Sequence, residues 1–82
     1  MKLDQARLLI AAGGITGATV RPQTPVEGGA WYVVFSLSYL AGNVDDAVLS
    51  AARGGVRTFK ELGSAASLLR QLGLREAIVQ LV

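Results

Sequence analysis

The basic residues around the Gly54-Gly55 pair are the side chains best suited to hold a ligand. Arg53, Arg57 and Lys60 occur within eight residues. The planar guanidinium of arginine can donate two parallel hydrogen bonds to a phosphate. A two-stranded ribbon that carries such residues can enter a DNA groove. Arg21 joins this set if its strand lies alongside. The sequence therefore predicts a nucleic-acid-binding hairpin whose phosphate contacts are Arg53, Arg57, Lys60 and Arg21.

The same charges have a second interpretation. Charged side chains on an exposed strand prevent two sheets from pairing edge to edge. Arg53 and Arg57 are therefore also what an unliganded hairpin at the rim of a sheet requires. The sequence leaves both interpretations open.

Other motifs carry little chemistry. The glycines of residues 13–17 resemble a phosphate loop, but they follow a predicted helix and precede a predicted strand, which is the reverse of a dinucleotide fingerprint. Asp45-Asp46 is the only acidic pair, and neighbouring residues of a strand point to opposite faces. With no Cys and no His in the chain, we expect no enzyme activity, no metal site and no cofactor.

Composition points to association. Hydrophobic residues make up 51% of the chain and charged residues only 17%, against an average charged content of about 25%. A small domain cannot bury so much apolar surface, and an exposed apolar patch commonly marks an interface. We expect a homo-oligomer, most simply a two-fold dimer. Tyr32, Val34 and Tyr39 are the predicted interface, because tyrosine suits surfaces that are both apolar and wet.

The elements that must position these residues follow from periodicity. Helical spacing predicts helices over residues 3–12 and 62–72. Alternation predicts strands over 15–21 and 30–38. The Gly-Gly pair predicts a hairpin of strands 46–53 and 56–60, with Arg53 opposite Val56 and Phe59 opposite Ser50. A final strand over 76–82 completes one domain, residues 1–82, of the α+β class: an antiparallel sheet of four to five strands in the order α-β-β-β-β-α-β.

One run of the chain is similar to a known group of proteins. The sequence VLSAARGGVRTFKELGSAASLLRQLG, residues 48–73, together with the upstream AWYVVF, resembles small uncharacterised accessory proteins of bacterial plasmids and integrating elements. The resemblance covers about residues 15–80. It implies a bacterial cytoplasmic protein encoded among partition, replication and conjugation genes, and it carries over no catalytic residue.

The sequence therefore favours a non-enzymatic, homodimeric accessory protein that binds DNA through its Arg-bearing hairpin. The alternative is an adaptor that docks a larger protein partner through an apolar face, for example by strand addition to a sheet edge. No segment reaches the ~18 apolar residues of a membrane span. We expect a cytoplasmic protein with no membrane partner.

Overall fold

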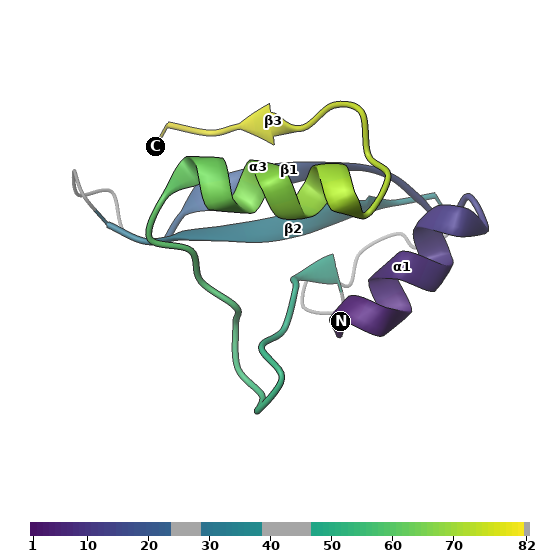
Figure 1. The fold of residues 1–82 in the computed structure, drawn as a ribbon, viewed down its shortest axis with the longest axis horizontal. Helices are drawn as coiled ribbons and strands as arrows, with labels where there is room; N and C mark the ends of the chain where they lie inside the picture. The colour runs from purple at the N-terminus through teal and green to yellow at the C-terminus, as the bar shows by residue number, and fades with distance from the viewer. Residues whose placement is uncertain (24–28, 39–46, 82) are drawn as a thin grey trace.

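The computed structural model describes residues 1–23, 29–38 and 47–81. Two helices and three strands lie in these ranges (Figure 1). The predicted helices at both ends and the two predicted N-terminal strands are confirmed to within two residues. The elements are α1 (Leu3–Ala11), β1 (Ile15–Pro22), β2 (Trp31–Leu37), α3 (Leu62–Gln71) and β3 (Ile78–Val79).

The sheet is mixed, so the predicted antiparallel sheet of four to five strands is wrong. Its order is β2-β1-β3, with β1 antiparallel to β2 and β3 parallel to β1. Residues 47–60 run antiparallel to β2, and therefore in the direction of β1. Because α3 then carries the chain back along the sheet, β3 must run in that same direction. Parallel strands need a crossover of this kind.

Residues 46–53 and 56–60 do not form the predicted two-stranded hairpin within the described part of the chain. Instead, isolated bridges attach this segment to the free edge of β2, where Val48 lies opposite Val34 and Phe59 lies opposite Trp31. Between these two anchors the chain leaves the sheet and returns. The predicted partner of Val56, Arg53, is replaced by Ser50. The predicted partner of Phe59, Ser50, is replaced by Trp31.

The buried face of the sheet follows the predicted alternation. Val33 and Phe35 of β2 are buried opposite Val20 and Ala18 of β1. A register shift between Ile15 and Gly17 adds one residue to β1. Such a bulge changes the alternation, and Ile15 is thereby buried together with Ala18 although the two are three positions apart and would lie on opposite faces of a regular strand.

Both helices contribute to one core on this face. Leu69 of α3 and Ala6 of α1 are buried in the same cluster as Val20 and Val33. Figure 1 shows α3 lying across β1 and β2. Gly73 follows α3 with φ +100°, the left-handed conformation that the sequence predicted for a glycine cap. No helix in the described ranges is long and apolar enough to cross a membrane.

Candidate interaction sites at the two sheet edges

The predicted hairpin tip is a projecting loop, which we call the basic loop, residues 50–57. The bridge between Ser50 and Val56 closes its base, and Figure 1 shows it extending away from the sheet. Gly54 and Gly55 have φ values of +95° and +72°, as predicted for this pair. Arg53 is exposed beside them. The loop therefore presents its first arginine to solvent.

Arg57, at the end of the basic loop, is held more firmly. Its backbone N–H donates to the Leu49 carbonyl oxygen at 3.0 Å. Its guanidinium carbon lies 5.2 Å from the centroid of the Phe59 ring, within the range of a cation–π contact. The ring orients the cation without neutralising its charge, so the guanidinium still has donors for an anion.

Arg57 also lines a hollow of about 300 Å³ at the start of α1. Lys2 adds a second cation to this hollow, and Asp4 adds a carboxylate. Lys60 is exposed three residues after Arg57. The chain from Ala47 to Lys60 contains no carboxylate, so the excess of charge along this edge is positive.

Arg21 does not belong to this cluster. It lies opposite Tyr32 in the β1–β2 ladder, one position away from the Pro22–Trp31 pair. Since Trp31 also pairs with Phe59, alternation places Arg21 on the other face of the sheet from the ring that Arg57 contacts. Its Nε is buried without a hydrogen-bond partner among the described residues. The structure thus gathers Arg53, Arg57 and Lys60 along one edge and separates Arg21 from them.

Two of the three predicted interface residues, Tyr32 and Val34, lie on the sheet face that Arg21 shares. Tyr32 and Val34 are half-buried there, and Val34 faces Val48 across the edge of β2. Tyr39 lies outside the described residues. Within those residues, the largest exposed apolar side chains lie elsewhere.

Residues 78–81 at the opposite edge carry the most prominent of them. Ile78 is 66% exposed, Val79 39% and Leu81 81%. The predicted strand over residues 76–82 is shorter in the structure, Ile78–Val79, and none of its residues was among the predicted interface residues. The available signal was that residues 77–82 contain no charged side chain, although a free strand edge is normally protected by charge.

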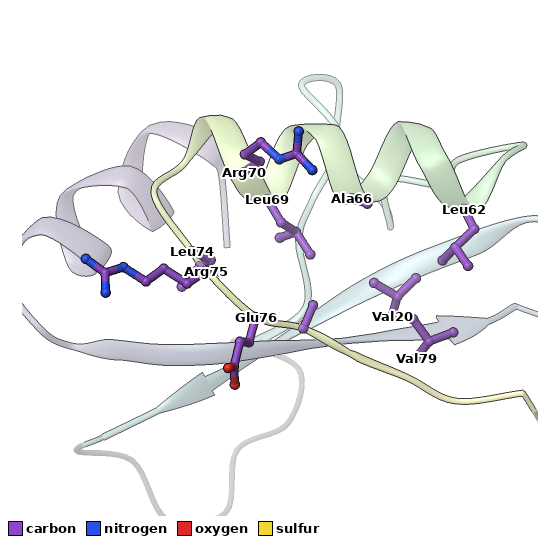
Figure 2. A pocket seen from close by; sticks show the side chains of 10 residues that line it. Val20, Leu62, Ala66, Leu69, Arg70, Leu74, Arg75, Glu76 and Val79 are labelled. Atoms are coloured by element: carbon purple, nitrogen blue, oxygen red, sulfur yellow. The ribbon is translucent and has the colours of Figure 1, made fainter.

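A groove of about 260 Å³ accompanies β3 on the helix-covered face. Figure 2 shows Leu62 and Leu69 of α3 above it and Val20 and Val79 of the sheet below. The side chains of Arg75 and Glu76 point away from this apolar floor. Arg70 also lines the groove, so the groove combines an apolar floor, which suits an apolar side chain, with charged residues around it.

A family model described as ParC-like matches residues 2–82. The chain belongs to the ParC-like family. The match spans nearly the whole sequence, and it agrees with the coarser part of the predicted resemblance, a small bacterial accessory domain.

Two further comparisons found no similar protein for this ParC-like chain: no curated protein and no solved structure matches it. Among the described residues, no group of three or more metal-ligating side chains that could hold an ion occurs. The indications of function therefore come from the two sheet edges.

Proposed function

We propose that this ParC-like chain is a non-enzymatic accessory protein of a bacterial mobile element, and that it binds nucleic acid through the basic loop. The observation that carries the proposal is the exposed Arg53 at the tip of a projecting loop, in a stretch of fourteen residues, 47–60, without a carboxylate. Arginine is the residue best suited to bidentate phosphate contacts.

The three cations have different roles in this proposal. Arg57, oriented by the Phe59 ring, presents its guanidinium in a restricted geometry and sets the direction from which a phosphate approaches. Arg53 and Lys60 are exposed and add contacts whose geometry adapts to the backbone. Phosphate contacts of this kind position a protein on nucleic acid without reading its sequence. We therefore expect binding that is strongly salt-dependent and weakly sequence-dependent.

The test is fluorescence anisotropy of labelled duplex and single-stranded DNA across a salt series. Each phosphate contact contributes a slope of about −0.9 to log K against log [salt] on duplex DNA. Arg53→Ala is expected to reduce the magnitude of the slope by about that amount. Arg7→Ala removes an exposed arginine of α1 and is the matched control, which is expected to leave the slope nearly unchanged.

The proposal is wrong if the protein fails to bind at low salt, where electrostatic attraction is least screened. It is also wrong if Arg53→Ala and Arg7→Ala lower the slope equally, because the charge would then act without regard to position.

A second candidate function, an adaptor for a larger protein, rests on a different observation. Ile78 and Leu81 are largely exposed beside an apolar groove at the β3 edge. Extended peptides bind sheet edges by strand addition, with backbone bonds for affinity and pockets for specificity. DNA binding whose salt slope falls with Arg53→Ala supports the first function, whereas a protein that does not bind DNA at low salt supports the adaptor.

A further inference from the structure

We propose that the β3 edge pairs with the β3 edge of a second copy of this chain, antiparallel, around a two-fold axis that passes beside Val79. The interface joins two sheets into one and uses residues 77–81 of each protomer. It is independent of the basic loop, which Figure 1 shows on the opposite side of the molecule.

The backbone of β3 has the symmetry that such pairing needs. The Gln80 N–H donates to the Val20 carbonyl oxygen at 2.9 Å, toward β1. Because backbone groups alternate along a strand, those of Val79 point away from β1, as do those of Ala77 and Leu81. The outward-facing residues are thus spaced symmetrically about Val79. In antiparallel pairing, Val79 lies opposite the partner's Val79, and Ala77 lies opposite the partner's Leu81.

The side chains fit the same register. Val20 and Val79 are partners in the ladder, so Val79 lies on the face that α3 covers, and both residues line the groove. Leu81, two residues further, has the same orientation by alternation, yet it is 81% exposed. Pairing about Val79 sets the partner's Leu81 beside Ala77, which also lines the groove. Each copy therefore supplies an unburied leucine and the apolar groove that receives one.

Two observations favour a second copy over a different protein partner. The first is the spacing of Leu81 and Ala77, a residue of the groove. A two-fold axis beside Val79 places each of them opposite the other in the partner, so the same surface is complementary to itself, as in an isologous interface. The second is that β3 has no charged residue between Glu76 and Leu81 and pairs with β1 through only two residues. An edge of this kind invites pairing with an identical strand.

Engineered disulfides test the register directly, since the natural chain contains no cysteine. Residues opposite each other in a hydrogen-bonded pair have Cα atoms about 5.5 Å apart, which suits a disulfide. Val79→Cys is expected to form a covalent dimer on mild oxidation at low protein concentration. Ala77→Cys alone is expected to form no cross-link under the same conditions, whereas a mixture of Ala77→Cys and Leu81→Cys proteins forms the cross-linked heterodimer. Equal cross-linking at residues 77 and 79 would overturn the proposed register.

Sedimentation equilibrium of the natural sequence tests the association itself. We expect a mass that rises with concentration from 8.6 kDa toward twice that value. Leu81→Glu is expected to raise the dissociation constant at least tenfold, because the interface loses the burial of a leucine and has to desolvate a carboxylate instead. The matched control is Leu8→Glu, on an α1 leucine that is 72% exposed, and it should dimerise like the natural protein.

The proposal is wrong if the protein is a monomer at every concentration up to about 1 mM. The free energy of association would then be weaker than about 4 kcal/mol, and the β3 edge would be the binding site of a different protein. Equal weakening by Leu81→Glu and Leu8→Glu would also overturn it. Neither outcome bears on DNA binding, which is measured separately through the Arg53→Ala variant.

Discussion

Residues 47–60 and β3 form the two edges of the same sheet, yet their side chains differ in kind. The first edge is interrupted by the basic loop and carries Arg53, Arg57 and Lys60. The second edge carries Ile78, Val79 and Leu81, all at least 39% exposed, and no charge. Charge and interruption keep the first edge from pairing with another strand, whereas nothing in the described residues prevents pairing at the second.

This difference is the basis of the two proposals. An edge that carries arginines offers side-chain donors to a polyanion. An uncharged edge offers its backbone groups to another strand. We therefore propose a nucleic-acid contact at the first edge and a protein contact at the second.

The largest expected effect comes from the core that supports both edges. Leu69 is 2% exposed and lies between α3 and the sheet. Leu69→Ala is expected to lower the free energy of unfolding by about 2–5 kcal/mol, because it removes buried methyl groups and leaves a cavity. Urea denaturation followed by circular dichroism measures the change. Leu8→Ala, at an exposed position, should cost less than about 0.5 kcal/mol, and similar costs for the two variants would contradict the packing of α3.

The next largest effect on stability is expected from replacing a glycine by alanine, and its sign should differ between the basic loop and α3. Gly55 has a φ of +72°, where a Cβ costs about 1–2 kcal/mol, so Gly55→Ala should destabilise the protein by about that amount. Gly63→Ala makes the same substitution inside α3, where the added Cβ meets nothing within 4 Å. Helix propensity predicts a gain of up to about 1 kcal/mol there. Thermal denaturation gives the melting temperatures, and we expect Gly55→Ala to lower it and Gly63→Ala to raise it. A change of the same sign in both variants would contradict the loop conformation.

The smallest expected effect concerns the orientation of Arg57. A double-mutant cycle of Arg57→Met and Phe59→Leu isolates the contact between guanidinium and ring from the loss of packing. We expect a coupling free energy of about 0.5–1 kcal/mol, typical of an exposed cation–π pair, from chemical denaturation of the four proteins. If the changes in unfolding free energy of the two single variants add up to that of the double variant, the Arg57 guanidinium and the Phe59 ring do not interact.

Sequence periodicity was sufficient for the elements that pack locally. The leucine and alanine stripe of residues 62–72 predicted α3, and the alternation of Val33 and Phe35 predicted the buried face of β2. These patterns could be predicted because the spacing of apolar residues along a single helix or strand determines which of its faces is apolar.

Pairing between distant segments was not predictable in the same way. The glycines at 54 and 55 do adopt positive φ, but the Ala51 N–H donates to the Gly55 carbonyl oxygen at 2.9 Å, so the turn is wider than a two-residue hairpin. The flanking residues then meet in a single bridge, between Ser50 and Val56, and the chain on either side of it bonds to β2. The direction of β3 likewise depends on the crossover through α3. No local pattern carries that information, and for the same reason the prediction grouped Arg21 with the loop.

The most direct test of the two-edge account is a pair of ¹⁵N–¹H NMR titrations on the same sample of this 8.6 kDa protein. We predict that a short DNA duplex shifts the amide signals of Arg53, Gly54 and Gly55 and leaves those of residues 77–81 in place. We predict that dilution shifts Ala77, Val79 and Leu81 and leaves the basic loop unchanged. Shifts at β3 on adding DNA, or a Val79 signal that does not respond to dilution, would contradict the account.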